Sequence, residues 1–244
     1  MAKLYVVGIG PGGLDQMTVQ AQHVLKTCDA IAGYTRYITL IKDFTEGKEI
    51  IKNGMRSEVE RCKTAVETAH QGKTVAMVSS GDSGVYGMAG LILEIVQQGD
   101  YSDVEVEIVP GVTSANACAS VLGAPLMHDY VTISLSDWLT ERSLIDKRLH
   151  AIGQGDFIAA IYNPRSKARP TIIDEARDIL LQYKSADTPV GLVKNAYREG
   201  QQVVLTTLGE MLDHEIGMLT TIIVGNAQTY IKDGKMITPR GYGL

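Results

Sequence analysis

The stretch that decides the fold of this chain reads Val75-Ala76-Met77-Val78-Ser79-Ser80-Gly81-Asp82-Ser83-Gly84-Val85-Tyr86-Gly87. Its apolar beginning predicts a buried strand, and the apolar segment from Met88 to Val96 predicts a helix. The small residues between them leave backbone amides and carbonyls uncovered, so that a ligand can reach these groups. In open α/β sheets a crevice at the carboxyl ends of strands is the usual ligand site. A tight turn without a ligand has the same composition, so this stretch alone leaves both interpretations open.

Two other strand ends in the first half of the chain have a similar composition. A strand predicted over 4–7 ends in Gly8-Ile9-Gly10-Pro11-Gly12-Gly13, and one predicted over 104–109 ends in Pro110-Gly111-Val112-Thr113-Ser114. The remaining strands and helices of this half alternate, with strands predicted over 30–34 and 50–52 and helices over 17–28, 59–69 and 115–122. Ser57 and Glu60 predict a capping box. The alternation predicts an α/β domain with a mostly parallel sheet.

The second half of the chain is predicted to form another α/β domain. Gly123-Ala124-Pro125 breaks a helix, which puts the boundary between domains 1–123 and 124–244. The expected elements are strands over 130–135, 156–162, 189–193, 202–207 and 220–224, and helices over 141–152 and 171–183. The tail alternates around Asp233-Gly234, which predicts a hairpin with a two-residue turn. This hairpin is expected to make the second sheet mixed.

Composition excludes several classes of function. The net charge of −5 argues against a nucleic-acid partner, and the 244 residues contain no apolar run long enough to span a membrane. The first residues lead directly into a strand pattern, so we expect a cytoplasmic protein without a signal peptide. Cys28, Cys62 and Cys118 form no Cys-x-x-Cys pair and are expected to be buried hydrophobic side chains. We therefore expect no protein-bound metal.

The first glycine loop formally matches the dinucleotide fingerprint Gly8-x-Gly10-x-x-Gly13. Pro11 lies inside that turn and removes an amide that could donate to a pyrophosphate. The acidic residue expected about 20 residues further on is also missing, because the second strand ends in Gly33-Tyr34-Thr35. A nucleotide-dependent oxidoreductase is therefore an alternative, disfavoured by two observations.

Taken together, the three glycine loops resemble signature segments of the tetrapyrrole methylases, which bind S-adenosylmethionine (SAM) in a cleft between two α/β domains. Further segments resemble one branch of that family, which methylates C17 of a precorrin or cobalt-precorrin precursor of cobalamin. These segments begin at Gly33, Leu126, Ile133, Tyr162 and Ile237. The resemblance covers essentially the whole chain. It implies the tetrapyrrole methylase fold, SAM as methyl donor with S-adenosylhomocysteine as product, and a homodimer.

The resemblance also implies which positions bind the cofactor. In the first domain these are Pro11, Gly81, Asp82, Ser83, Val85, Thr113 and Ser114. In the second domain they are Leu135, Tyr162, Asn163, Ala196 and Thr221. A carboxylate suits the two positive charges of SAM, which agrees with this placement of Asp82. An N-cap for a helix beginning at Ser83 would need an aspartate equally well, and both roles stay open.

The substrate needs groups of the opposite charge, because a tetrapyrrole carries many carboxylates. Arg36, Arg165 and Arg198 are expected to bind them, and Lys167 and Arg169 are either helpers or solvated loop residues. Candidate acid–base residues are Tyr34, Lys52 and His128. Tyr34 occupies the position where another branch of the family has an aspartate, so that branch's acid–base scheme does not carry over. His128 follows a proline turn and is a candidate to relay protons, and a packed turn histidine is the alternative.

The sequence therefore predicts a SAM-dependent C-methyltransferase that acts on a tetrapyrrole. Such a methyl transfer needs no covalent enzyme nucleophile, since positioning and exclusion of water supply most of the catalysis. Another precorrin methyltransferase, a dinucleotide-dependent oxidoreductase and a non-catalytic tetrapyrrole carrier are the alternatives. A metal-free and a cobalt-containing substrate both remain open, with the cobalt form favoured.

Overall fold

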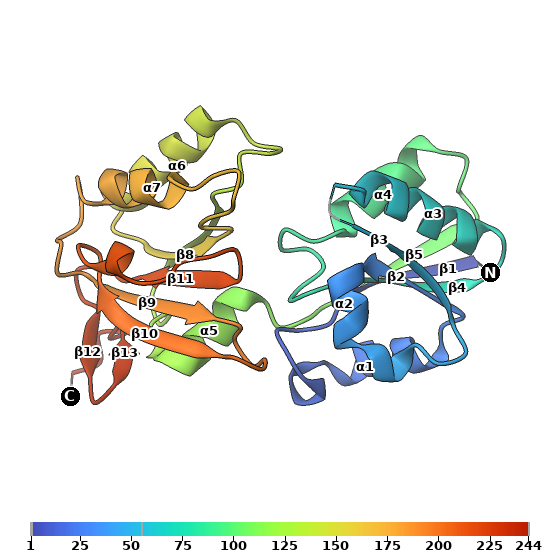
Figure 1. The fold of residues 1–244 in the computed structure, drawn as a ribbon, viewed down its shortest axis with the longest axis horizontal. Coiled ribbons are helices and arrows are strands. Elements are labelled where there is room, and N and C mark those ends of the chain that lie inside the picture. The colour runs from blue at the N-terminus through green and yellow to red at the C-terminus, as the bar shows by residue number, and fades with distance from the viewer. Residues whose placement is uncertain (1, 55, 244) are drawn as a thin grey trace. The chain divides into compact units, whose positions relative to one another are not determined.

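A computed structural model describes residues 2–54 and 56–243 of the chain. Contacts divide the chain into two compact units, Met1–Ser114 and Ala115–Leu244, and each unit has its own sheet (Figure 1). The boundary expected between residues 123 and 124 lies at the other end of helix α5 (Ser114–Leu122). This helix goes with the second unit because its Leu122 packs on Gly191, where a Cβ atom would lie 2.4 Å from a leucine methyl carbon.

The first unit contains a five-stranded sheet in the order β3-β2-β4-β1-β5. All its strand pairs are parallel, which confirms the prediction. The strands are β1 (Ala2–Gly8), β2 (Ala30–Tyr34), β3 (Glu49–Asn53), β4 (Thr74–Ser79) and β5 (Val104–Val109). In this strand order, the connection after β1 leads to β2 in one direction, and the connection after β4 leads to β5 in the opposite direction. Because β1 and β4 are neighbours, the sheet's topological switch point lies between their carboxyl ends, where ligands bind in open α/β sheets.

Two layers of helices cover the two faces of this sheet (Figure 1). Apolar side chains of α1 (Val19–Thr27) and α2 (Thr35–Leu40) pack in one buried cluster, and those of α3 (Glu58–His70) and α4 (Ala89–Gln98) in the other. Short 3-10 turns span Leu14–Gln16 and Lys42–Phe44. The predicted capping box at α3 is wrong, because the Ser57 side chain makes no capping bond. Its φ of −115° and ψ of 28° depart from the extended backbone that N-cap residues adopt.

The second unit contains a five-stranded sheet in the order β10-β9-β11-β8-β7, and this sheet is mixed, as predicted. Its strands are β7 (Tyr130–Ser134), β8 (Ile158–Tyr162), β9 (Pro189–Lys194), β10 (Gln202–Thr207) and β11 (Thr220–Val224). Strand β7 pairs with β8 in parallel, whereas β11 runs antiparallel to both β8 and β9. It follows that β7, β8 and β9 point the same way, and β11 begins where they end.

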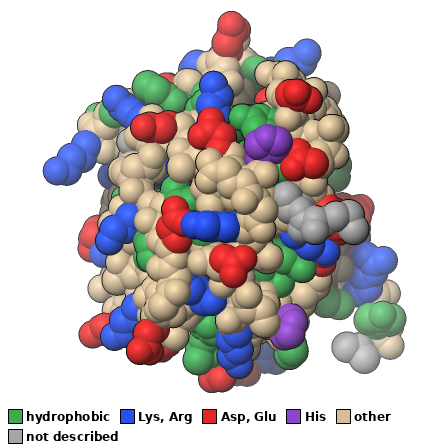
Figure 2. All heavy atoms as spheres, turned by 90° about the vertical axis from the view of Figure 1, so that its right-hand side faces the viewer, with side chains coloured by type: hydrophobic (Ala, Val, Ile, Leu, Met, Phe, Trp, Pro, Cys, Tyr) green, Lys and Arg blue, Asp and Glu red, His purple; other side chains and the backbone are tan. Residues whose placement is uncertain are grey.

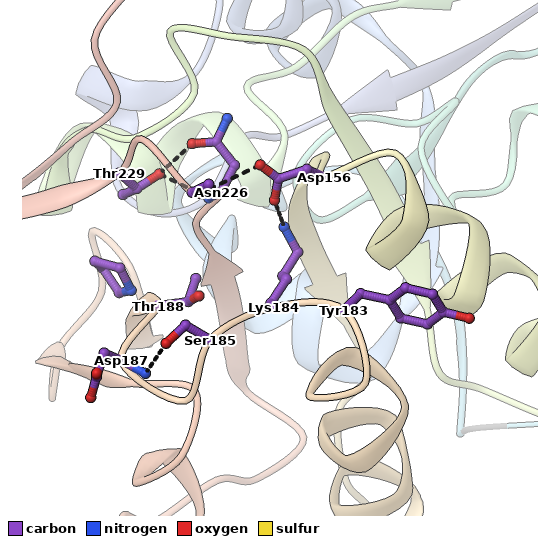
Figure 3. Close-up of a pocket in the computed structure, with 10 residues that line it drawn as sticks. Asp156, Tyr183, Lys184, Ser185, Asp187, Thr188, Asn226 and Thr229 are labelled. Atoms are coloured by element: carbon purple, nitrogen blue, oxygen red, sulfur yellow. Dashed lines mark hydrogen bonds and ion pairs between the residues drawn. The ribbon is translucent and has the colours of Figure 1, made fainter.

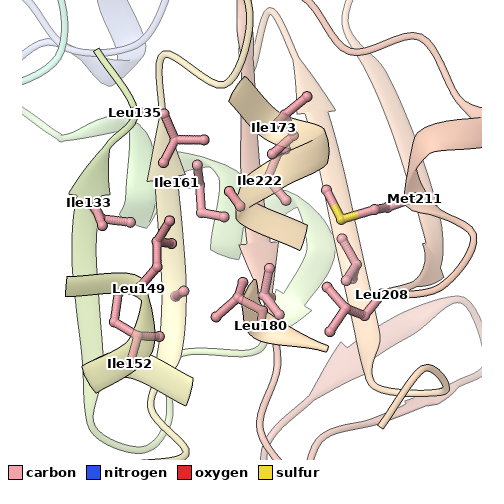
Figure 4. Close-up of a cluster of buried hydrophobic side chains, with 14 of the residues drawn as sticks. Ile133, Leu135, Leu149, Ile152, Ile161, Ile173, Leu180, Leu208, Met211 and Ile222 are labelled. Carbon is pink, nitrogen blue, oxygen red and sulfur yellow. The ribbon is translucent and has the colours of Figure 1, made fainter. Parts of the chain in front are cut away.

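One face of the second sheet is covered by α6 (Arg142–Gln154) and α7 (Ile172–Leu180). Figure 4 shows the apolar side chains that fill the space between these helices and the strands, among them Leu149, Ile161 and Ile222. A 3-10 turn at Met211–Asp213 adds Met211 to this core. This core stabilises the sheet whose strand ends carry the candidate ligand-binding residues of this unit.

The predicted hairpin is present as β12 (Tyr230–Lys232) and β13 (Lys235–Ile237). Its two turn residues have positive φ, 50° at Asp233 and 71° at Gly234, as a two-residue turn of the primed type requires. The hairpin does not join the main sheet, and this part of the prediction was wrong. It forms a separate three-stranded sheet with β6 (Gly123–Ala124), and the antiparallel β11 makes the main sheet mixed.

Acidic and basic side chains are interspersed over the face of the molecule seen in Figure 2. That face offers no continuous basic surface of the kind that nucleic-acid binding requires. Among the described residues, none of the helices has both the length and the apolar character needed to cross a membrane.

Candidate functional site

The three glycine loops of the first unit meet backbone to backbone at the carboxyl edge of its sheet. Gly10 and Gly81 form an antiparallel bridge, in which the Gly10 amide donates to the Gly81 carbonyl (3.0 Å) and the Gly81 amide to the Gly10 carbonyl (2.8 Å). A Cβ atom on Gly111 would lie 2.2 Å from the Gly81 oxygen, and one on Gly8 2.7 Å from it. Only glycine fits at positions 8 and 111, so the loops after β1, β4 and β5 are held together at the switch point.

Asp82 ties the β4 loop to the β5 loop. Its Oδ1 accepts hydrogen bonds from the amides of Gly84 (2.8 Å) and Val85 (3.1 Å), and its Oδ2 accepts one from the Gly111 amide (3.0 Å). The helix N-cap considered for Asp82 is wrong in its detail, because α4 begins only at Ala89. The carboxylate instead holds the turn before that helix and the neighbouring loop.

Ser83 uses its side chain inside the unit. The residue is 0% exposed, and its hydroxyl donates to the carbonyl of Val6 at 3.1 Å. The resemblance implied a cofactor contact for Ser83, and the buried hydroxyl leaves only its backbone available for such a contact. The Ser83 side chain instead fixes the loop to the sheet, so that only its neighbours present side chains at the surface.

The other expected residues of the first unit come together around this point. Pro11 follows the Gly10 bridge directly and is buried, whereas Val85 is half-buried. Thr113 and Ser114 lie opposite Gly81, where a Cβ atom would be 3.7 Å from the Thr113 Cα and from the Ser114 amide nitrogen. Sequence segments roughly 70 and 30 residues apart thus form one compact surface, with spacing set by the order of the strands.

The five expected residues of the second unit also share one edge of its sheet. They are Leu135 after β7, Tyr162 and Asn163 at the end of β8, Ala196 after β9, and Thr221 at the beginning of β11. The register fixes this, since Tyr162 pairs with Ser134 and Thr221 pairs with Val193. The structure thus gathers all five, although they come from four separate segments.

Their side chains are not equally accessible. Leu135 is 0% exposed and belongs to the apolar core, so its side chain faces away from any ligand at this edge. The Tyr162 hydroxyl accepts a hydrogen bond from the Ala115 amide (2.8 Å) at the start of α5. Asn163 donates from Nδ2 to the Ser134 hydroxyl (2.9 Å). Leu135 can therefore contact a ligand only through its backbone.

Several loops at this edge contain non-glycine residues with left-handed backbone. Asn163 has a φ of 52°, and Asn195 and Tyr197, on either side of Ala196, have φ of 54° and 58°. Tyr86, in the β4 loop of the first unit, has a φ of 55°. Such conformations are costly for a tyrosine and concentrate at functional sites. This signal cannot be read from the sequence; it occurs in loops that the resemblance had selected, and also outside them at Arg56, Asp156 and Asp233.

The candidate acid–base residues Tyr34 and Lys52 lie on adjacent strands at the carboxyl edge of the first sheet. Tyr34 pairs with Asn53, and Lys52 pairs with Gly33. Paired residues of parallel strands share a face, so the side chains of Tyr34 and Lys52 leave the sheet on opposite faces. The structure brings these two residues to one edge but does not place them to act as a pair.

His128 lies at the other edge of the second sheet, before β7 instead of after it. Its Nδ1 accepts a hydrogen bond from the Asp129 amide (3.0 Å), and its ring is exposed. The five residues of β7 separate it from the edge that carries Tyr162, a distance of about 15 Å. Within this unit, the structure does not bring His128 to the other candidate residues.

The candidate substrate arginines differ in what their charges already contact. Arg36 is exposed on α2. Arg165 donates to Asp174 on α7 (2.7 Å), so its charge is compensated and it fastens its own loop. Arg198 lies in the loop after β9 beside the left-handed Tyr197. Sequence reasoning did not anticipate the tie between Arg165 and Asp174, which needs the helix to be placed beside the loop.

A pocket of about 440 Å³ lies at the opposite edge of the second sheet (Figure 3). Lys184 reaches into it from the end of α7 and pairs with Asp156 (2.7 Å), while donating to the Gly225 carbonyl (3.1 Å). Its side chain is 1% exposed, and Asp156 also accepts from the Ala227 amide. The charges therefore neutralise each other, and the pair joins three segments of the unit.

The cysteines are free and buried, as expected. Burial raises the pKa of the Cys62 thiol from 9.0 to about 11, and it raises that of Cys28 as well. Neither is therefore suited to act as a thiolate nucleophile near neutral pH. In the described part of the chain, no group of three or more His, Cys, Asp or Glu side chains is arranged to hold a metal ion.

Two α/β units with glycine-rich loops at a switch point define a class of enzymes that bind a small cofactor at strand ends. The model of the family Tetrapyrrole (Corrin/Porphyrin) Methylases matches residues 3–212, and the chain belongs to this family. The chain is 52% identical to "Cobalt-factor III methyltransferase" of Priestia megaterium, over 98% of this chain and 45% of that longer protein.

Two further proteins resemble the chain over their whole length. "Probable cobalt-factor III C(17)-methyltransferase" of Salmonella typhimurium is 51% identical, over 99% of this chain and 100% of that one. The crystal structure of the methyltransferase CobJ superimposes with a TM-score of 0.92 at 33% identity, covering 98% of this chain and 100% of that one. The chain thus spans less than half of one relative and all of another.

Proposed function

We propose that the chain is a SAM-dependent methyltransferase that methylates C17 of a tetrapyrrole precursor of cobalamin, with coupled ring contraction. The observation that carries this proposal is the contact of Gly8, Gly81 and Gly111, which closes three loops against one another at the switch point. Membership of the tetrapyrrole methylases and the names of the two relatives that are about half identical support the reaction.

The residues at this edge suit a cofactor with a sulfonium and an α-ammonium group. The loops present backbone carbonyls, and Asp82 adds one negative charge that three amides hold in place. We propose that Pro11, Gly81, Val85, Thr113 and Ser114 bind the methionine end of SAM. Residues at the shared edge of the second sheet, Tyr162, Asn163, Ala196 and Thr221 with the Leu135 backbone, are proposed to bind the adenine end.

SAM supplies an electrophilic methyl group that a ring carbon of the substrate can attack in line. The task of this chain is to hold that methyl group against one carbon and to keep water out. The packed glycine loops serve this purpose because their backbone cannot move without breaking the Gly10–Gly81 bridge. We also propose that Tyr34 and Lys52, whose side chains leave the sheet on opposite faces, transfer protons. Arg36 and Arg198 are proposed to bind carboxylates of the substrate.

The cobalt-containing substrate is favoured over the metal-free one. The two relatives described above, at 52% and 51% identity, carry cobalt-factor III in their names, which supports cobalt-factor III or cobalt-precorrin-3 over precorrin-3B. The metal in this case belongs to the substrate. A cytoplasmic homodimer is also proposed; the three free cysteines agree with a reducing compartment, and the resemblance supports the dimer.

The test is to incubate the purified chain with methyl-labelled SAM and cobalt-factor III or precorrin-3B, and to follow the pigment by mass spectrometry. The proposal expects transfer of one labelled methyl group and S-adenosylhomocysteine as product. Binding of the pigment without label would indicate a carrier. Calorimetric binding of NADH, with no response to S-adenosylhomocysteine, would establish the oxidoreductase alternative and exclude the methyltransferase.

A further inference from the structure

The loop that follows β7 presents two large apolar side chains to solvent. Trp138 is 62% exposed and Leu139 is 92% exposed, although tryptophan and leucine are among the residues that proteins usually bury. The loop leaves the sheet at the edge that carries Tyr162 and Asn163. An adjacent apolar pair at a candidate ligand edge indicates a binding surface more strongly than scattered surface leucines do.

The base of this loop is held firmly. Arg169 donates from Nη1 to the Leu135 carbonyl (3.0 Å) and pairs through Nε with Asp137 (3.5 Å). Leu135 itself is anchored in the core, and its amide donates to the Tyr162 carbonyl (3.0 Å). Trp138 therefore follows directly on a fastened segment, so the protein presents its indole from a fixed base.

Two basic residues lie on the loop that is tied to the base of this segment: Arg169, whose charge is paired with Asp137, and Lys167. Arg169 connects the β7 loop with the loop between β8 and α7, and the latter loop also carries Lys167. Lys167 is exposed, and among the described residues it has no ion pair. An exposed apolar pair on one loop, with an exposed lysine on the loop that Arg169 ties to it, matches a flat molecule that has an apolar face and a carboxylate rim.

We propose that Trp138 and Leu139 form a platform for one face of the tetrapyrrole macrocycle, with Lys167 contacting a carboxylate at its rim. This inference rests on the proposed function and adds a substrate-binding surface to it. The indole ring stacks on the conjugated macrocycle, and Leu139 extends the apolar contact. Reacting atoms must come close to the cofactor, and a loop that leaves the cofactor edge can reach a substrate placed there.

A second copy of the chain is a poorer occupant for this platform. A stable interface between proteins buries about 800 Å² on each partner, and two side chains provide only a fraction of that area. A tetrapyrrole is of the size that two apolar side chains and a cation can cover on one side. The substrate is therefore the occupant to which the platform is assigned.

The test measures tetrapyrrole affinity separately from cofactor affinity. Cobalt-factor III is titrated into protein saturated with S-adenosylhomocysteine, and the absorbance change of the pigment gives the dissociation constant. We expect Trp138→Ala to raise this constant about 10-fold and Trp138→Phe to stay near the wild type, because phenylalanine keeps an aromatic face. Leu144, which is 40% exposed on α6, gives the matched control, and Leu144→Ser should change nothing.

Affinity for S-adenosylhomocysteine, measured by calorimetry, should be the same in all these proteins. The chain contains a single tryptophan, so protection of its fluorescence from acrylamide by bound pigment reports on Trp138 directly. The platform is overturned if Trp138→Ala binds pigment like the wild type, loses both ligands together, or turns a dimer into a monomer in sedimentation. If the wild-type protein neither binds nor methylates the pigment, the proposed function itself is wrong. If the wild type binds the pigment and Trp138→Ala binds it equally well, only the platform is wrong.

Discussion

Replacing Asp82 by asparagine separates the two tasks of its side chain. The carboxylate accepts from Gly84 and Val85 through Oδ1 and from Gly111 through Oδ2. Asparagine keeps one carbonyl oxygen, which can go on accepting from the turn. Its NH₂ group then faces the Gly111 amide, and two donors cannot bond to each other.

The size of the effect follows from these three contacts. A hydrogen bond to a charged group contributes about 1.5–3 kcal/mol, so loss of the Gly111 bond alone should lower the free energy of unfolding by about 2 kcal/mol. If the same 2 kcal/mol is needed to hold the β5 loop for the cofactor, the affinity for S-adenosylhomocysteine falls about 30-fold. The Gly10–Gly81 bridge does not involve Asp82, so the β1 and β4 loops should stay together.

Calorimetric titration with S-adenosylhomocysteine and urea unfolding measure the two quantities separately. Asp100→Asn is the matched control, because it removes the same charge from an exposed position of the same unit. It should leave both quantities within error of the wild type. An Asp82→Asn protein that is destabilised yet binds with unchanged affinity would refute the reasoning, since the tie would then serve folding alone.

The remaining predictions concern a close contact, a buried charge and a buried thiol. Gly111→Ala should abolish measurable S-adenosylhomocysteine binding, because its Cβ would lie 2.2 Å from a backbone oxygen; Gly13→Ala, with nothing within 4 Å, should bind normally in the same titration. Asp156→Asn should lower the free energy of unfolding by about 3 kcal/mol, because it leaves the buried Lys184 charge unpaired. Lys184→Met should lower it by less, because it removes that buried charge. Urea unfolding of the two variants checks this order. The raised pKa of Cys62 favours the folded state below pH 9, and this stability should be lost as the pH rises from about 9 to about 11. The fall in urea midpoint over that window should be smaller in Cys62→Ala, and an equal fall would contradict the assignment.

The sequence was sufficient for nearly all strands and most helices, because their apolar patterns have clear periods and their ends carry glycine or proline. Helix α2 was not predicted, since Thr35–Leu40 is only six residues long and three of these are β-branched. Strand β6 has two residues and exists only because β13 lies beside it. Elements of this kind depend on tertiary contacts, and no local sequence pattern predicts them.

The candidate site shows a similar division. The sequence indicated the candidate loops through their small residues and through the resemblance, and the observed strand order then brings the carboxyl ends of β1, β4 and β5 together. What each side chain does there could not be predicted. Ser83 and Leu135 lie within site motifs, yet the structure buries both side chains, and Arg165 pairs with an aspartate on the next helix. A motif specifies a backbone path, whereas the direction of a side chain depends on neighbours that come from elsewhere in the chain.

This distinction changes how Asp82 should be understood. From the sequence its charge was the argument, because a carboxylate attracts a cationic cofactor. In the structure both of its oxygens already accept hydrogen bonds from backbone amides. The main effect of Asp82 is therefore on the conformation of the loops. A neutral acceptor with the right geometry could then replace much of its function, whereas a misplaced charge could not. Asp82→Glu keeps the charge but moves it by one methylene, so it should bind SAM, which carries both positive charges, no better than Asp82→Asn. Calorimetry of the two variants side by side decides between charge and geometry, and recovery of affinity in the glutamate protein would favour charge.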